Sequence, residues 1–160
     1  MTLLKNLLLA PLMASALAQV VLAKEPHVLE YERKNPVVLE MLRLAEAGDV
    51  DRQYVLGFIY TTLKDESGPR WYRRAYEGYV KRAEKGDPEA MYKVGVMHFD
   101  GTGVSKDLRK AAEWYQKAAD RDHQEAQQQL AGMYQFGDGV EADEDKAFYW
   151  MSRAASQNKP

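Results

Sequence analysis

The sequence predicts an all-α solenoid of about three stacked helix pairs, on the evidence of three features. When the chain is shifted by 36 residues, matching residues coincide without a gap between Ala90 and Ala155. Within each repeat the apolar residues fall at helical spacing, and no segment alternates in the way of a strand. A Gly-x-Gly turn, Gly101 to Gly103 in the central repeat, separates the two helices of a pair.

The repeat extends over most of the chain, with units at approximately 45–83, 84–119 and 120–157. A fragment upstream, Ala45 to Asp49, echoes Ala83 to Asp87 at a spacing of 38. The first unit matches the second through Arg74-Ala75, Tyr79, Lys81 and Ala83. The second matches the third through Gly101 with Gly137, Gly103 with Gly139, Val104 with Val140, Asp107 with Asp143, Lys110 with Lys146, Ala111 with Ala147, and Trp114 with Trp150.

Start and stop signals place the helices in order. We expect them at 36–47, 51–64, 70–85, 88–99, 106–120, 124–136 and 143–157. Asn35 is the expected cap of the first, with Pro36 at its first position. Residues 24–34, bracketed by Pro26 and Pro36, fit either a helix that seals the first unit or an arm outside the stack.

The central unit gives the clearest signals. Asp87 and Pro88 are a cap and a first helical residue, and the apolar face of the helix then includes Val94. Gly101 and Gly103 permit the positive φ of a sharp reversal, and Asp107 is expected to cap the next helix. In the third unit, Asp122 with Glu125 predicts a capping box.

Composition excludes several classes of protein. The chain has 160 residues, with 22 Lys and Arg against 24 Asp and Glu, a formal net charge of -2. Because nucleic-acid binders need a basic excess, we expect no nucleic acid as partner. The absence of cysteine excludes disulfides, a cysteine nucleophile and a thiolate metal site. Stability must therefore come from stacking of the repeats.

Residues 1–23 have the layout of a secretory signal peptide, and Lys5 is their only charge. Cleavage after Ala18 and cleavage after Ala23 both satisfy the small-x-small rule. The alternative is an uncleaved membrane anchor, which Pro11 and the polar residues of the run disfavour. Either outcome predicts export, to the periplasm, with membrane contact only through an uncleaved signal peptide.

The residues that carry chemistry form no recognisable constellation. His27, His98 and His123 lack metal-ligand spacing, and His98 aligns with the packing positions of Tyr60 and Tyr134. No strand precedes the Gly-x-Gly turns, so they are better explained as turns than as phosphate loops. The acidic run 141–145 lacks calcium-loop spacing and suits a helix start. We therefore expect no catalytic residue, no metal and no cofactor.

Two features predict partner binding. A second apolar stripe opposite the packing face could line a groove, or could simply pack between helices; it consists of Tyr54, Phe58, Tyr92, Val96 and Phe99. The other feature is a cluster of cations with an aromatic, which could recognise an acidic surface or anionic lipid, or be an ordinary solvated face. It consists of Arg70, Trp71, Arg73 and Arg74.

The repeated residues resemble the SEL-1-like repeat (SLR), a relative of the tetratricopeptide repeat. The resemblance covers roughly residues 45–157 and rests on Gly101, Gly103, Val104, Asp107, Lys110, Ala111, Trp114, Tyr115, Lys117, Ala118 and Ala119, with their counterparts in the third unit. It implies a right-handed superhelix. The sequence departs from the pattern at 61–69 in place of the glycine turn, at Gly78 in place of tryptophan, at Ala131 in place of Gly57 and Gly95, and at Asp122 in place of a corner glycine.

The resemblance also implies a class of function. Exported bacterial members of this family serve as adaptors, regulators and immunity proteins that neutralise phospholipase effectors of type VI secretion. We therefore expect a non-catalytic binding module whose partner is another protein, such as a toxin or lipase effector. A cell-envelope scaffold is the alternative. A β-lactamase-like hydrolase is disfavoured because the members linked to that activity carry a disulfide in each unit, whereas this chain has no cysteine.

Overall fold

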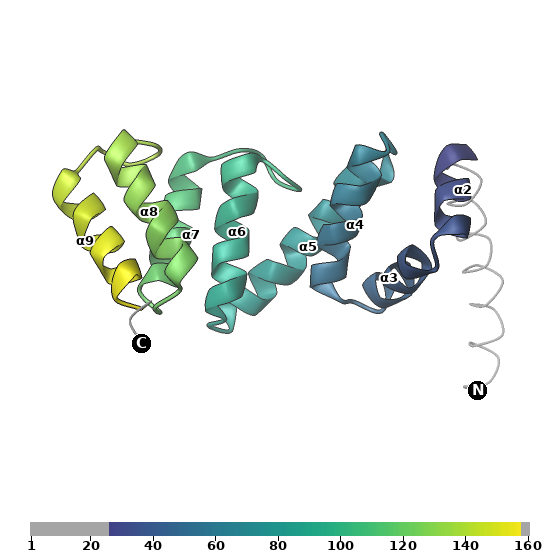
Figure 1. Cartoon of the computed structure of the whole chain (residues 1–160), viewed down its shortest axis with the longest axis horizontal. Coiled ribbons are helices and arrows are strands. Elements are labelled where there is room, and N and C mark those ends of the chain that lie inside the picture. Colours follow the sequence, from purple (N-terminus) through teal and green to yellow (C-terminus); the bar gives the residue numbers. More distant parts are fainter. Residues whose placement is uncertain (1–25, 158–160) are drawn as a thin grey trace, which may run out of the picture.

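The computed structural model describes residues 26–157, and the described part of the chain is a row of helices without a strand (Figure 1). This confirms the all-α fold. The helices are α2 (Pro26–Lys34), α3 (Pro36–Glu46), α4 (Val50–Thr62), α5 (Ser67–Glu84), α6 (Pro88–Asp100), α7 (Leu108–Ala119), α8 (Gln124–Phe136) and α9 (Glu144–Ser156). The signal peptide expected at 1–23 and both of its cleavage sites lie outside the described residues.

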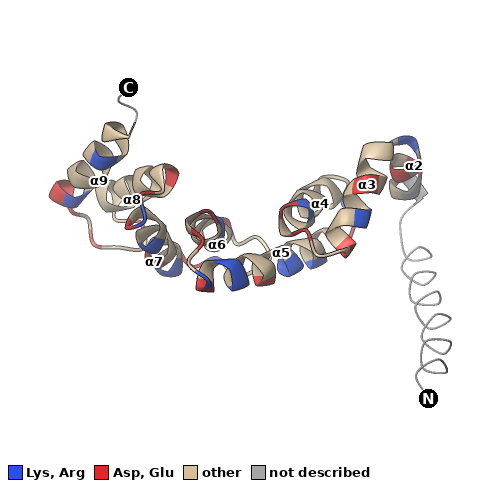
Figure 2. Ribbon diagram, turned by 90° about the horizontal axis from the view of Figure 1, so that it is seen from below, with Lys and Arg blue, Asp and Glu red and all other residues tan. Residues whose placement is uncertain are grey.

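The helices pack as successive pairs along an arch. Helices α4 with α5, α6 with α7, and α8 with α9 form the pairs, and α5 and α7 also pack against the first helix of the next pair. Figure 2 shows α4, α6 and α8 along the inner side of the arch and α5 and α7 along its outer side. The main core runs without interruption from Tyr72 to Trp150, so burial between pairs holds the solenoid together.

Most of the predicted helix starts are confirmed at atomic level. The side chain of Asp87 accepts a hydrogen bond from the Ala90 backbone N–H at 3.2 Å. Asp107 and Asp143 accept equivalent bonds from Lys110 at 3.0 Å and Lys146 at 2.9 Å. The first helix of each of these pairs ends at a left-handed glycine, as the turn signal predicted.

Two predicted caps differ from the expectation. Asn35 occupies the N-cap position of α3, but its side chain makes no capping hydrogen bond; its Nδ2 instead donates to the Tyr31 carbonyl at 2.6 Å, back into α2. The capping box of Asp122 is absent because Asp122 occupies the corner itself, with φ +60°, where earlier units have glycine. His123 is the cap of α8, and its Nδ1 accepts from the Ala126 N–H at 3.2 Å.

The helix expected at 70–85 starts earlier, at Ser67. Asp65 is buried and accepts hydrogen bonds from the backbone N–H and the hydroxyl of Ser67, which satisfies the first turn. Gly68 then packs against Thr61, with no room for a side chain between them. The segment 61–69 therefore forms a different corner, in which Asp65 bonds the start of α5 and Gly68 packs on Thr61.

The segment after Pro26 is a helix that seals the first pair. Val28 of α2 is fully buried with Leu56, and Glu32 accepts a hydrogen bond from the Tyr60 hydroxyl. Helix α3 packs on α4 in the way that the outer helix α7 packs on α8. At both places a buried glutamine donates a hydrogen bond from Nε2 to a carbonyl of the preceding helix: Gln53 to Ala45 at 2.8 Å, and Gln127 to Ala119 at 3.1 Å. None of the helices in the described part is long and apolar enough to cross a membrane.

Candidate interaction surface

The predicted apolar stripe lies on α4 and α6, the helices of the inner side of the arch (Figure 2). Its members differ in exposure. Phe58 is 62% exposed, whereas Tyr54, Tyr92, Val96 and Phe99 are half-buried against the main core. The stripe is therefore open at Phe58 and partly covered elsewhere.

The two tyrosines of the stripe pack between helices. The Tyr54 ring meets the Tyr72 ring edge-on, with centroids 5.3 Å apart. The Tyr92 ring stacks on His123 at 4.7 Å and lies 5.8 Å from Tyr115. Burial raises the pKa of both stripe tyrosines above the ordinary value. The tyrosines of the stripe therefore pack between helices, whereas the Phe58 side chain is exposed.

The stripe continues beyond the residues that the sequence singled out. Val55, next to Tyr54, is 39% exposed on α4. Sequence reasoning missed it because its counterpart one unit later is Lys93, which hides the apolar pattern. On α8, Gly132 occupies the repeat position of Phe58 and Val96, and a side chain at Gly132 would meet open space. We call Val55, Phe58, Tyr92, Val96 and Gly132 the inner face.

The predicted cationic cluster does not form one surface. Trp71 is only 7% exposed and packs in a second core cluster, with Leu56 and Tyr60 of α4. It is buried because it shares the inward face of α5 with Ala75 and Tyr79. Arg74 lies over the Trp71 ring at 4.7 Å and forms an ion pair with Glu46 at 2.9 Å.

The remaining two cations of the cluster, Arg70 and Arg73, are exposed on α5, and neither has an ion-pair partner within residues 26–157. They are the part of the cluster that a partner could reach.

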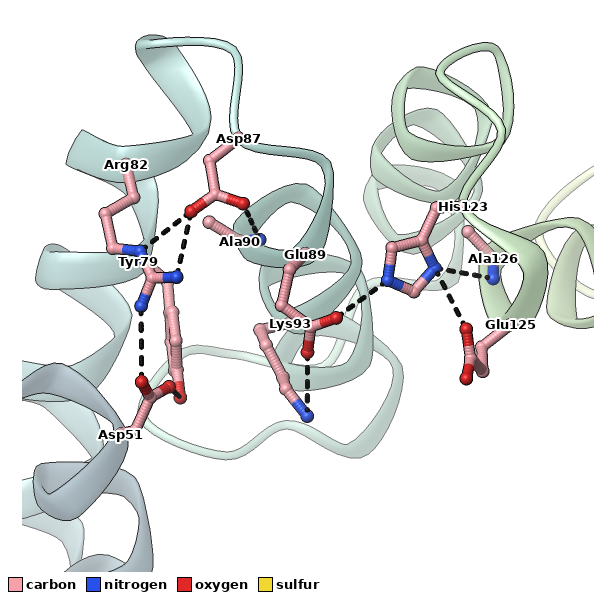
Figure 3. Close-up of polar contacts among 10 residues, drawn as sticks. All are labelled: Asp51, Tyr79, Arg82, Asp87, Glu89, Ala90, Lys93, His123, Glu125 and Ala126. Atoms are coloured by element: carbon pink, nitrogen blue, oxygen red, sulfur yellow. Dashed lines mark hydrogen bonds and ion pairs between the residues drawn. The ribbon is translucent and has the colours of Figure 1, made fainter.

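Polar contacts tie neighbouring units together (Figure 3). Asp51 of α4 accepts hydrogen bonds from Tyr79 at 2.7 Å and Arg82 at 3.4 Å, and Arg82 also pairs with the cap Asp87 at 2.9 Å. Burial opposes the charge of Asp87, but the hydrogen bonds from Ala90 and Arg82 hold its pKa below the ordinary value.

The next junction is built around His123. Its Nε2 lies 2.9 Å from Glu89 of α6, while its Nδ1 accepts the backbone bond that caps α8. Since Nδ1 is an acceptor there, the neutral ring carries its proton on Nε2 and donates it to Glu89. These contacts link each unit to the next one along the solenoid.

His98 occupies a packing position, as its alignment with Tyr60 and Tyr134 predicted. It is 3% exposed, and its Nε2 lies 3.2 Å from the Tyr76 hydroxyl. Burial lowers the pKa of His98. The groups of α7 that act on its charge are Lys110, Asp107 and Glu113.

We expect replacement of His98 by tyrosine to flatten the pH dependence of stability. The unfolded chain takes up a proton on this histidine near its ordinary pKa of about 6.5, before the folded chain does, so the free energy of unfolding falls below that pH. Urea unfolding at about pH 7.5 and about pH 5.5 should show a smaller loss for His98→Tyr than for the unaltered chain. Carboxylate caps titrate at lower pH and are common to both proteins. Equal losses would contradict a buried neutral histidine.

The described residues hold no group of three or more His, Cys, Asp or Glu side chains that could bind a metal ion. The Gly-x-Gly turns have a packing role: a side chain on Gly103 would lie 2.5 Å from the Tyr72 carbonyl oxygen of the preceding unit. The glycines thus permit close stacking of one unit on the next.

Comparison with known proteins identifies the repeat. The family model described as Sel1 repeat matches residues 88–123 and 124–159. A crystal structure of a Sel1 repeat protein from Oxalobacter formigenes is 30% identical, over 74% of this chain and 88% of that one, with a TM-score of 0.56. Among curated proteins, no significant match was found.

Two further solved structures are similar. The protein c5321, a protective antigen of uropathogenic Escherichia coli strains with an SLR fold, is 37% identical over 74% of this chain, with a TM-score of 0.57. The match spans only 25% of that longer protein. Helicobacter pylori cysteine rich protein B is 22% identical over 69% of this chain and 90% of its own, with a TM-score of 0.53, a likeness of fold alone.

Proposed function

The chain belongs to the Sel1 repeat family, whose solenoids are protein-interaction modules, and we propose that it is an exported binding protein that holds its partner against the inner face. The observation that carries this proposal is the exposure of Phe58 and Val55 on α4, a helix of the inner side of the arch (Figure 2). A large aromatic side chain that is 62% exposed beside other apolar residues is typical of a contact surface rather than of a stabilising core.

The inner face also has the character of a contact surface for protein. It is apolar on α4, half-buried and aromatic on α6, and lined on α8 by exposed glutamines beside Gly132. Amide side chains can pair with backbone groups of a partner without the desolvation cost of a charge. Lys93, the cation nearest to this face on α6, is already paired with Glu89 at 3.3 Å.

Export to the periplasm is part of the proposal. It rests on the signal-peptide layout of residues 1–23. The protein to be tested is accordingly the full chain expressed in its host and recovered from the periplasmic fraction. Its intact mass distinguishes cleavage after Ala18 from cleavage after Ala23 and from an uncleaved anchor.

We expect Phe58→Ser to weaken capture of the periplasmic partner by about tenfold or more, because the exposed ring is the largest apolar contact on the inner face. The measurement is affinity capture from periplasmic extract, followed by titration with the partner that is recovered. Leu39→Ser is the matched control: Leu39 is 48% exposed, but its repeat position is that of Glu77 on the outer helix α5.

Both variants change exposed residues, so folding should be unaffected and circular dichroism can check it. Unchanged capture by Phe58→Ser, or an equal loss with Leu39→Ser, would remove the inner face from the proposal. The tyrosines are poorer probes, since truncating Tyr92 would also disturb its stacking on His123.

In its narrower form, the proposal makes the partner a phospholipase effector of type VI secretion that acts in the periplasm, with this chain as the immunity protein. The family resemblance and the export signal support this form. If a phospholipase gene lies beside this gene, inhibition of that phospholipase by the purified protein would support this form. A neighbouring locus of envelope-synthesis genes would favour a cell-envelope scaffold instead. Hydrolysis of a β-lactam reporter, abolished by one substitution, would replace both with an enzyme.

A further inference from the structure

One repeat position of the outer helix lies against the first helix of the next pair. In α5 this residue is Tyr76, whose ring lies 5.5 Å from His98 of α6. In α7 the equivalent residue is Ala112, which is 5% exposed beside Leu130 of α8. In α9 it is Phe148, which is 74% exposed. Helix α9 therefore exposes a large aromatic ring at a position that is half-buried in α5 and buried in α7.

A second stacking contact is open at the start of the same helix. The turn glycines Gly103 and Gly139 sit against the backbone of the preceding outer helix, at Tyr72 of α5 and at Leu108, the first residue of α7. The corresponding residue of α9 is Glu144, which is exposed. A hollow of about 250 Å³ lies between α8 and α9, lined by Gln135, Glu144, Ala147, Phe148 and Met151. Within residues 26–157, no helix covers either of these contacts of α9.

Charge at this end differs from charge at the buried junctions. The position of Arg73 in α5 and Arg109 in α7 is taken by Asp145 in α9. Residues 124–157 contain six acidic residues and two basic ones. Around the open helix start, Glu141, Glu144 and Asp145 are exposed, and none has an ion-pair partner in the described range 26–157. The exposed Phe148 ring therefore lies on a helix whose first turn carries carboxylates without an ion-pair partner among the described residues.

We propose that the open face of α9 binds a basic amphipathic helix of a partner protein, seated on α9 as α8 is seated on α7. The apolar side of that helix covers Phe148, and its lysines or arginines meet Glu144 and Asp145. This surface is separate from the inner face, and it stands whether or not the inner face binds a protein.

A second copy of the chain is a poorer occupant. Among the described helices, α4, α6 and α8 are already covered, by α3, α5 and α7. Helix α2, which precedes α3, carries two acidic and two basic residues, so it has no basic excess to offer to α9. The charge of the open face of α9 also demands a basic partner, whereas α8 itself contains one acidic residue and no basic one.

The probe is a peptide with the sequence of α8, residues 124–136, and with lysine in place of the exposed glutamines 128, 129 and 135. It keeps Ala126, Leu130 and Tyr134, which form the side of α8 that covers α7. The matched peptides carry glutamate at the same three places, or the lysine peptide's residues in scrambled order. Titration of ¹⁵N-labelled protein, followed by NMR, should show shifts in α9 with the lysine peptide alone.

Variants of the protein locate the site. Phe148→Ser should weaken binding of the lysine peptide by about tenfold, and Glu144→Gln with Asp145→Asn by several-fold, with loss of salt dependence. Leu39→Ser, at an exposed apolar residue of α3 outside both surfaces, should bind like the unaltered protein. Circular dichroism checks that each variant is folded.

Four results would overturn the proposal. The first is that the glutamate peptide or the scrambled peptide binds as well as the lysine peptide, and the second is that Phe148→Ser binds the lysine peptide undiminished. The third is that the lysine peptide does not bind at about 1 mM. The fourth is a dimer of the protein in analytical ultracentrifugation that Phe148→Ser abolishes. The last result would assign the face to a second copy. None of them bears on capture of a partner at the inner face, which Phe58 tests.

Discussion

Replacing Gly139 by alanine is expected to lower the free energy of unfolding by about 3 kcal/mol. Gly139 has φ +71°, a conformation that a side chain disfavours, and its Cβ would lie 2.8 Å from the Arg109 backbone nitrogen and under 3.0 Å from the Leu108 carbonyl. Because these neighbours are helix backbone, they cannot rotate away, and the two units would have to separate locally.

Gly137→Ala is the matched control in the same turn. Its φ of +75° is equivalent, but the nearest atoms to a new Cβ lie 3.6 Å away, an ordinary contact. We expect this variant to lose only about 1 kcal/mol, the cost of the backbone conformation. Urea unfolding of the two variants separates conformational strain from crowding between units. Equal losses would mean that Gly139 is needed for its φ alone.

The helical repeat could be predicted because its signals are local. The caps Asp87, Asp107 and Asp143 each bond a backbone N–H three residues ahead, so the residue type and its spacing determine the contact. The corner at Asp122 shows where locality fails. Aspartate caps helices and also tolerates a left-handed φ, and the register of the corner decided between the two.

The interaction surface was predictable only in part, because exposure depends on which helix comes next. Trp71 and Phe58 are both aromatic residues on amphipathic helices, yet one is 7% and the other 62% exposed. Phe148 is the sharper case: its repeat position predicts burial, and only the structure shows that no described helix covers it. Such surfaces arise on a helix whose sequence follows the repeat but on which no further described helix packs.

The second large effect is expected at Tyr115 of α7. This side chain is 1% exposed in the main core, so Tyr115→Ala should lower the free energy of unfolding by about 3–5 kcal/mol, the range for removing a buried aromatic ring. Tyr149→Ala, at a position 54% exposed on α9, should change it by less than about 0.5 kcal/mol. A similar loss for both tyrosines would mean that the core between pairs contributes little.

The partner of Tyr115 makes the prediction more specific. A Cβ on Gly95 of α6 would lie 2.6 Å from the Tyr115 ring, so Gly95→Ala should destabilise the unaltered protein by about 1–3 kcal/mol. In a Tyr115→Ala background the obstacle is gone, and the same substitution should stabilise by up to about 1 kcal/mol through helix propensity. The third unit already shows this exchange, with Ala131 at the glycine position and Met151 in place of the tyrosine. A double-mutant cycle in urea measures the change of sign. The same effect of Gly95→Ala in both backgrounds would mean that the glycine is required by something other than the ring.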